Sequence, residues 1–182
     1  GDASWNDCVR YVRDVYRPYV LNAGKVPGWR VFSLGLQRDY ERTKDQLSKQ
    51  AVLELANNSA YAAAGGGPSF RLSRETAYLI QAYLSAEELG QPRYPQLAVA
   101  VNYALGHLDQ WAVHDSAEFV QPFMVALTTE ALIRYQQKTG DARILPALQR
   151  VWDWVWDKTW DPNSKAFLYI LCKPGADASP SD

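Results

Sequence analysis

The sequence predicts an all-α protein of about seven helices, arranged as repeated helical hairpins with a short extended segment near the C-terminus. Its strongest support is an internal repeat. Moving residues 74–110 forward by fifty positions places them on residues 124–160, so that Gly90 falls on Gly140. Within each copy, apolar residues recur every three to four positions on both sides of a tight break, which is typical of two amphipathic helices. Hairpins that repeat at a fixed period are the signature of stacked or ring-closed helical architectures.

A leading helix and a weaker third copy of the hairpin are predicted before the two clear copies. Apolar residues at helical spacing predict the first helix over residues 4–21, and Pro18 should bend or weaken its last turn. Residues 22–28 are rich in helix breakers and predict a loop. The third copy is expected over residues 30–43 and 46–61, shorter than the later copies by about four residues.

The two clear copies follow an irregular connection over residues 62–73. Its three consecutive glycines do not predict a phosphate-binding loop, because no Gly-Lys-Ser/Thr ending and no preceding strand accompany them. Ser73 is expected to cap the next helix with its side chain. The helices are then expected over residues 74–89, 92–112, 116–138 and 141–159.

Individual residues mark the ends of these helices. Gly90 and Gly140 stand where a helix C-terminus needs a left-handed residue, a conformation that glycine adopts without a Cβ penalty. Asp141 is placed to begin the next helix as its N-cap. Pro122 is tolerated only in a first turn, which favours a later start of this helix, closer to Gln121.

The C-terminal part is expected to be non-helical. Residues 160–165 predict a turn that leads into a short extended run over residues 166–171. Residues 173–182 consist largely of Pro, Gly, Ser and Asp, which predicts a flexible tail. We therefore expect one helical domain over residues 1–172.

Composition and charge narrow the classes of partner. The 182 residues carry a net charge of −1 with acids and bases interspersed, which argues against a nucleic-acid partner. No membrane span is predicted and no signal peptide is visible, so the location stays open, with an extracytoplasmic one favoured. Two His and two Cys without close spacing predict neither a metal site nor a cofactor. Cys8 and Cys172 could form a disulfide or remain free thiols.

Two motifs carry a family resemblance. Residues 135–141 contain a Thr-Gly-Asp break between two helices, and residues 160–162 form a Trp-Asp-Pro turn into an aromatic strand. This pattern resembles the α/α-toroid superfamily, which contains six-hairpin glycosidases, unsaturated glucuronyl hydrolases, some polysaccharide lyases and N-acylglucosamine 2-epimerases. The resemblance covers most of the chain, but its motifs report hairpin architecture rather than activity.

The chain departs from a closed toroid in length. A toroid of that superfamily has six hairpins, whereas this sequence predicts three and one leading helix. An open half-ring would expose the apolar side faces of its end hairpins to water. We therefore expect either that the chain is part of a longer parent, which is the favoured interpretation, or that a homodimer or another partner covers the ends.

The resemblance also implies where a site would lie. In such rings the helix before each tight break lies inside, and its N-terminus faces a ligand funnel surrounded by the long connections. Aromatic rings, of which this chain has seven Trp and eleven Tyr, commonly line sugar-binding surfaces when they are not buried. The residues expected to bind a saccharide at this end are Trp29, Arg30, Arg74, Tyr78, Gln121 and Trp160. Those expected to handle protons are Glu75, His114, Asp115 and Glu118, with burial supplying the acid of a carboxylate pair.

Each candidate also has a structural interpretation. Asp115 or Ser116 could cap a helix, Glu118 could be a first-turn acid, and His114 could be a solvated loop residue. Arg74 could bind a uronate carboxylate or could pair with a neighbouring acid.

His107 and a stripe of side chains in the last predicted helix are expected in the interior. His107 lies among apolar neighbours in a predicted helix and is expected to be structural. Trp154 is expected to point away from the core. The stripe expected to pack in the core consists of Trp152, Val155, Trp156 and Thr159.

Three functions follow from the sequence. The first is a carbohydrate-active domain: a hydrolase, lyase or epimerase that acts on a saccharide at the long-loop end. The second is a non-catalytic helical domain that binds a glycan or a protein, or completes a ring with its partner. The third is a structural fragment without activity of its own. A catalytic domain needs a buried carboxylate at the loop end, whereas a binding module needs only the aromatic rings.

Overall fold

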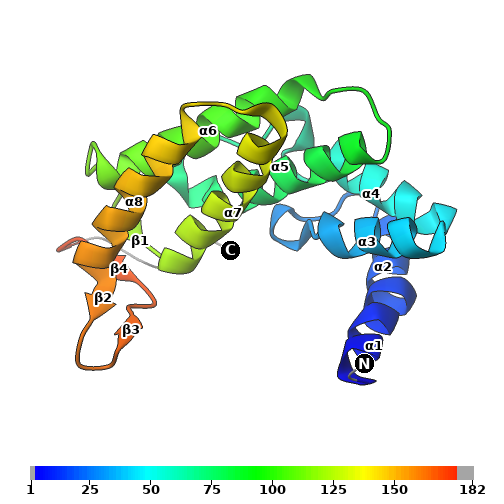
Figure 1. Ribbon diagram of the computed structural model, residues 1–182, viewed down its shortest axis with the longest axis horizontal. Helices are drawn as coiled ribbons and strands as arrows, with labels where there is room; N and C mark the ends of the chain where they lie inside the picture. The colour runs from blue at the N-terminus through cyan, green and yellow to red at the C-terminus, as the bar shows by residue number, and fades with distance from the viewer. Residues whose placement is uncertain (1–2, 176–182) are drawn as a thin grey trace.

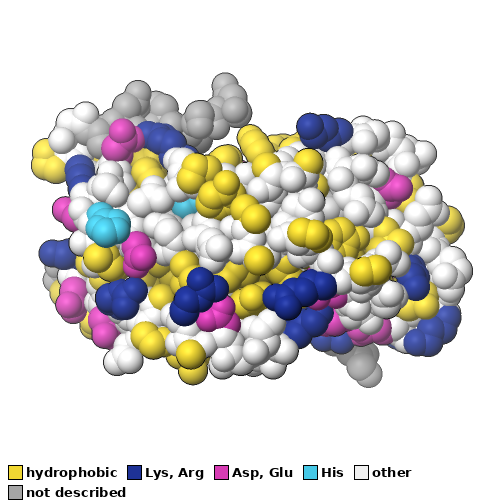
Figure 2. Space-filling model, turned by 90° about the horizontal axis from the view of Figure 1, so that it is seen from above, with side chains coloured by type: hydrophobic (Ala, Val, Ile, Leu, Met, Phe, Trp, Pro, Cys, Tyr) yellow, Lys and Arg dark blue, Asp and Glu magenta, His cyan; other side chains and the backbone are white. Residues whose placement is uncertain are grey.

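The computed structural model describes residues 3–175, which fold into an arch of helices with two legs (Figure 1). The N-terminal helix forms one leg, and the last helix with the C-terminal strands forms the other. The all-α class is confirmed, because the strands among the described residues are two residues long each. No helix in this part of the chain is long and apolar enough to cross a membrane. Seen from above in Figure 2, hydrophobic side chains reach the surface in several places, with Lys, Arg, Asp and Glu side chains lying between them.

The helices, in chain order, are α1 (Ala3–Tyr11), the π-helical η1 (Val12–Tyr16), α2 (Arg17–Asn22), α3 (Ser33–Thr43), α4 (Gln46–Asn58), α5 (Ser73–Glu88), α6 (Pro95–Ala112), α7 (Pro122–Thr139) and α8 (Ile144–Thr159). The first three, α1, η1 and α2, follow one another without a break and form the first leg, which we call the rod. Short 3-10 turns are η2 (Gly28–Arg30), η3 (Ala62–Ala64) and η4 (Phe70–Leu72). The strands are β1 (Phe119–Val120), β2 (Trp160–Asp161), β3 (Ala166–Phe167) and β4 (Leu171–Cys172).

The three predicted hairpins are present as α3–α4, α5–α6 and α7–α8. The helices that precede the tight breaks, α3, α5 and α7, pack side by side in one layer. Helix α4 packs against α3, α5 and α2, and α6 packs against α5 and α8. In Figure 1, α3 and α7 lie on the underside of the arch, below α4 and α6. Because successive helices run in opposite directions, the long connections gather at one end of the inner layer.

Helix α5 is the centre of this layer. Twelve of its sixteen residues are buried, and it packs against α3, α4, α6 and α7. A helix that is covered on nearly every side needs small or apolar residues around its whole circumference. Its sequence meets this need with alanines, leucines and short hydroxyl side chains, such as Ser73, Thr76 and Ser85.

One arginine ties the three inner helices together. Nη2 of Arg134 on α7 donates to Oε1 of Gln37 on α3 at 2.8 Å and to Oε2 of Glu88 on α5 at 2.7 Å. Its Nη1 donates to Oε1 of Gln81 at 2.7 Å and to Oγ of Ser85 at 3.2 Å. Although burial opposes the charged form of Glu88, the hydrogen bonds from Arg134 and Gln37 lower its pKa.

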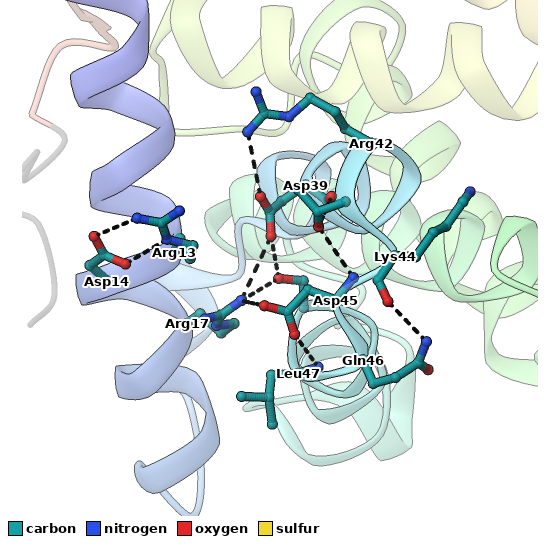
Figure 3. A network of polar contacts seen from close by, with 11 residues as sticks. Arg13, Asp14, Arg17, Asp39, Arg42, Lys44, Asp45, Gln46 and Leu47 are labelled. Atoms are coloured by element: carbon teal, nitrogen blue, oxygen red, sulfur yellow. Dashed lines mark hydrogen bonds and ion pairs between the residues drawn. The ribbon is translucent and has the colours of Figure 1, made fainter.

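A second polar network joins the rod to the first hairpin (Figure 3). Nη1 of Arg17 lies 2.6 Å from Oδ2 of Asp45 and 3.7 Å from Oδ2 of Asp39. Ser48 donates to the same Asp39 oxygen at 2.6 Å. Asp45 is also the N-cap of α4, since its Oδ1 accepts from the backbone N–H of Leu47. The rod is thus held at its α2 end, while α1 extends beyond the body of the arch.

The predicted first helix is present as the rod, which continues to Asn22. Pro18 is the second residue of α2 and lies two residues after the end of the π-helical segment η1, so the chain departs from regular α-helical geometry just before the proline. A π-helical turn changes the hydrogen-bond ladder locally, and proline is tolerated in a first helical turn.

Several predicted helix starts are wrong by a few residues. Helix α3 begins at Ser33 rather than residue 30, and α6 begins at Pro95 rather than residue 92. Helix α7 begins at Pro122 with Gln121 as its N-cap, so the later of the two predicted starts is confirmed. Proline is favoured in the first helical turn, where its missing N–H has no intrahelical partner to lose.

Two predicted caps are also wrong. Ser73 is the first residue of α5 rather than its cap, and its Oγ faces the sulfur of Met124 at 3.7 Å. Asp141 lies before the start of α8 at Ile144 and accepts a hydrogen bond from the N–H of Arg143 at 3.0 Å. This Asx-type turn stabilises the connection and not the helix itself. Gly140 does adopt the predicted left-handed conformation, with φ of 71°.

The predicted extended run near the C-terminus is divided between two small sheets. Strand β3 pairs with β2, and strand β4 pairs with β1. Both cysteines carry free thiols, since Cys8 lies in the N-terminal leg and Cys172 in β4. Lys173 still donates from its backbone N–H to the carbonyl of Glu118 at 2.9 Å. The predicted flexible tail otherwise lies outside the described residues from 176 onward.

The Trp stripe of α8 is only partly in the core. Val155 and Thr159 are buried, and Trp152 is half-buried and donates to Oγ1 of Thr129 at 2.9 Å. Trp156 is 55 % exposed, which contradicts the prediction. Its side of α8 faces away from α6 and α7, where no further hairpin of the described chain covers it. Trp154 is half-buried and packs against the core, so the prediction that it points away from the core is wrong.

His107 is a core residue, as predicted. Its ring is fully buried, and Nε2 lies 2.8 Å from the carbonyl oxygen of Gly67. A carbonyl can only accept, so Nε2 carries the proton and Nδ1 has the lone pair. Nδ1 is buried without a hydrogen-bond partner among the described residues. Burial therefore lowers the pKa of His107 to about 4.

The lowered pKa of His107 predicts that the free energy of unfolding falls in weak acid. The unfolded chain takes up a proton near the ordinary pKa of 6.5, whereas the folded chain does so only near 4, so stability falls as the pH drops between these values. The expected contribution is about 2 kcal/mol between pH 7 and pH 5. Urea unfolding at both pH values measures it. His107→Gln should flatten the pH dependence, and His114→Gln, at an exposed position, should not; an unchanged slope in His107→Gln would contradict the assignment.

Candidate functional site

The predicted site residues fall into separate groups at the long-loop end. Trp29, Arg30, Arg74, Glu75 and Tyr78 gather where α3 and α5 begin. His114, Asp115 and Glu118 lie in the connection between α6 and α7. No hydrogen bond or ion pair among residues 3–175 joins this second group to Glu75.

Trp29 and Arg30 of the first group line a groove between the rod and the start of α3. Its volume is about 480 Å³, and most of its lining is aromatic or apolar. The lining residues are Tyr11, Val12, Val15, Tyr16, Tyr19, Trp29, Arg30, Phe32 and Gly35. Trp29 and Phe32 are each 48 % exposed, which leaves large ring surfaces open to a ligand.

Stacking and hydrogen bonds hold the rings of this groove. The guanidinium carbon of Arg30 lies 4.3 Å from the centre of the Trp29 ring and 5.5 Å from that of Tyr19. The hydroxyl of Tyr16 donates to the Arg30 carbonyl at 2.5 Å and accepts from the N–H of Phe32 at 2.8 Å. Burial raises the pKa of Tyr16, so the hydroxyl keeps its proton for this bond.

Tyr78 connects the groove to α5. Its ring packs edge-on against Phe32 with centroids 5.2 Å apart. Burial raises its pKa, and the positive charge of Arg74 partly opposes this rise, so its hydroxyl is a neutral hydrogen-bond donor at physiological pH. The side chain is half-buried, with its hydroxyl in the field of Arg74, Glu75 and Glu130.

Glu75 is the buried carboxylate of this group. Its Oε1 accepts from Nη2 of Arg74 at 2.6 Å and from Nε at 3.0 Å. Its Oε2 is buried and has no hydrogen-bond partner among the described residues. Native structures rarely leave a buried carboxylate oxygen unpaired, because the lost hydration is not replaced. Oε2 is therefore the oxygen left to exchange a proton or accept a hydrogen bond.

Gly28 packs against the side chain of Glu75. A Cβ atom at Gly28 would lie 2.7 Å from Cγ of Glu75 and 3.1 Å from Cδ2 of Tyr61. Only a residue without a side chain can approach the carboxylate so closely. The segment that carries Trp29 and Arg30 thus packs directly against Glu75 through Gly28.

The second group is exposed and bound in surface ion pairs. Glu118 pairs with Arg71, and Oδ1 of Asp115 lies 3.2 Å from Nζ of Lys173. The side chains of Glu118 and Asp115 are 55 % and 73 % exposed, so neither carboxylate is buried as the predicted acid required. His114 is exposed as well. Asp115, Ser116 and Glu118 do not cap a helix either, because α7 begins only at Pro122.

The last two predicted binding residues lie away from the groove. Gln121 is buried as the N-cap of α7, and its side chain makes no cap hydrogen bond. The indole of Trp160 stacks on Trp156 with ring centres 4.9 Å apart and 8° between the planes. Both therefore act in the structure of the α7–α8 hairpin and its strands.

The sequence did not predict that the rod forms a wall of the groove. Its apolar residues at helical spacing predicted a core face, but Tyr11 and Val15 are 61 % and 50 % exposed. Three tyrosines on one face of a leading helix were the available signal. Among the described residues, no three His, Cys, Asp or Glu side chains gather in an arrangement that could hold a metal ion.

Comparisons with protein-family models, curated proteins and solved structures find no match to this chain. The aromatic groove and the buried carboxylate of Glu75 are therefore the features that bear on function.

The contact between Gly28 and Glu75 predicts the effect of adding one methyl group. Gly28→Ala should displace Glu75 or the Trp29 segment and lower the free energy of unfolding by roughly 1–3 kcal/mol. Gly106→Ala is the control, because nothing lies within 4 Å of a Cβ at that helical position. It should stabilise the protein by about 0.5–1 kcal/mol. Equal effects of the two substitutions in urea unfolding would show that Gly28 is not seated on Glu75.

Proposed function

We propose that this protein is a carbohydrate-active domain that binds a saccharide in the aromatic groove and uses Glu75 for proton transfer. The observation that carries the proposal is the unpaired, buried Oε2 of Glu75 beside a groove with exposed aromatic rings. Aromatic faces match the C–H faces of sugars, and a carboxylate held by an arginine can act as a general acid or base. The layered hairpins support the further proposal that the arch is part of an α/α toroid.

The residues at the starts of α3 and α5 each have a role in this proposal. Trp29, whose ring is fixed by Arg30, is the stacking platform. Tyr78 donates a hydrogen bond to a sugar hydroxyl, and Arg74 holds Oε1 of Glu75 so that Oε2 reacts. Because Oε2 is covered, binding must move the segment around Gly28 aside. Closing of that segment over the sugar would exclude water from the reaction.

Two substitutions separate binding from catalysis. Trp29→Ala should weaken saccharide binding by about tenfold, which corresponds to one lost stacking contact. Glu75→Gln keeps the shape of the side chain and should abolish turnover while binding changes little. A panel of neutral and uronate-containing oligosaccharides is tested by calorimetry for binding, by reducing-end release for hydrolysis, by ultraviolet absorbance for lyase products and by NMR for epimerisation.

The matched controls are Tyr169→Ala for binding and Glu118→Gln for turnover. Both replace exposed residues outside the groove. Full activity of Glu75→Gln on a proven substrate would remove the catalytic role. Equal binding by Trp29→Ala and the parent protein would remove the groove as the saccharide site.

The second candidate function is a non-catalytic interaction domain. It is favoured by the exposed apolar residues on both legs of the arch, such as Tyr11 and Tyr169. Saccharide binding without turnover of any panel member would support this candidate over the enzyme.

A further inference from the structure

The C-terminal leg presents a cluster of exposed aromatic and aliphatic side chains. We call it the C-terminal surface; it consists of Phe123, Trp156, Phe167, Leu168 and Tyr169. Stacking fixes its shape. Phe167 packs edge-on against Trp156 and Trp160 at 5.8 and 5.2 Å, and Tyr169 stacks on Phe123 at 5.8 Å. Tyr169 is 73 % exposed and stands out from the leg.

The N-terminal leg presents a hollow. We call it the N-terminal surface; it is lined by Cys8, Val9, Val12, Gly35, Arg38, Asp39 and Arg42 and has a volume of about 350 Å³. Val12 and Gly35 form the boundary between this hollow and the aromatic groove of the candidate site. The hollow is therefore separate from the saccharide groove, although it is large and apolar enough to receive an aromatic side chain.

Arginines border the hollow, and aspartates border the C-terminal surface. Arg38 and Arg42 have side chains 74 % and 62 % exposed; Arg38 pairs with Glu41 at 2.6 Å, and Arg42 lies 3.9 Å from Asp39. On α8, Asp153 and Asp157 flank Trp156 and are exposed. Neither aspartate forms an ion pair with another described residue of the chain. Opposite charges around apolar surfaces set the orientation of association.

We propose that two copies of this chain associate leg to leg, each N-terminal surface receiving the C-terminal surface of the other copy. The two legs project from the same side of the arch in Figure 1. A half-turn about one axis then brings both pairs of surfaces together at once, and the assembly closes as a symmetric dimer. The protruding aromatic residues fill the hollow, and the aspartates of α8 face Arg38 and Arg42. This inference does not depend on saccharide binding.

Charge reversal and mixing test the arrangement. Light scattering after size exclusion should give twice the chain mass for the parent protein. Arg38→Glu/Arg42→Glu and Asp153→Arg/Asp157→Arg should each raise the dissociation constant at least about tenfold, because both contacts of the dimer become repulsive. An equimolar mixture of the two variants should regain a dimer, since one contact is then unchanged and the other is reversed on both sides.

A control substitution and a check of folding accompany these variants. Arg93→Glu reverses an exposed arginine outside both surfaces and should leave the mass unchanged. Circular dichroism verifies that each variant is folded. A monomeric parent protein, a dimer that survives Arg38→Glu/Arg42→Glu, or a mixture that stays monomeric would overturn the proposal.

Discussion

The arrangement of the arch depends on the guanidinium group of Arg134. Three parallel inner helices, α3, α5 and α7, meet mostly through small and apolar side chains, and the other polar contacts between them, such as Gln37 with Glu88 and Lys138 with Glu87, each join only two helices. Arg134 donates to Gln37 on α3 and to Gln81, Ser85 and Glu88 on α5. Because these bonds are directional, they set the register of all three helices. The burial of α5 then supplies most of the apolar contact of the layer.

Register at one end of the layer determines the geometry at the other. The helices are rigid, so fixing their C-terminal halves also fixes where α3 and α5 begin. Those starts carry Phe32 and the Arg74–Glu75 pair, and the Trp29 segment is seated on them through Gly28. The network of Arg17 holds the rod against the same hairpin and so completes the groove. The contacts that stabilise the layer and the residues of the candidate site thus lie towards opposite ends of the inner helices.

Local signals predicted the hairpins and half of the site. The glycine at 140 and the proline at 122 act on their own segments, and Arg74, Glu75 and Tyr78 could be placed because they follow a helix start. Contacts between distant segments could not be predicted. The bond from Tyr16 to the Arg30 carbonyl makes the rod a wall of the groove, and the pair of Arg71 with Glu118 holds that carboxylate in a surface ion pair. Neither leaves a periodic trace in the sequence.

The most direct test is a double-mutant cycle between Arg134 and Glu88, read from the free energy of unfolding in urea. Their atoms lie 2.7 Å apart, and the two side chains are 18 % and 37 % exposed. We expect a coupling of about 1 kcal/mol between Arg134→Met and Glu88→Ala, after allowance for partial exposure. The surface pair Arg150–Asp109, with side chains 49 % and 38 % exposed, is the control and should couple by less than about 0.5 kcal/mol. A coupling at Arg134 no larger than that of the control would contradict its role as the link between the inner helices.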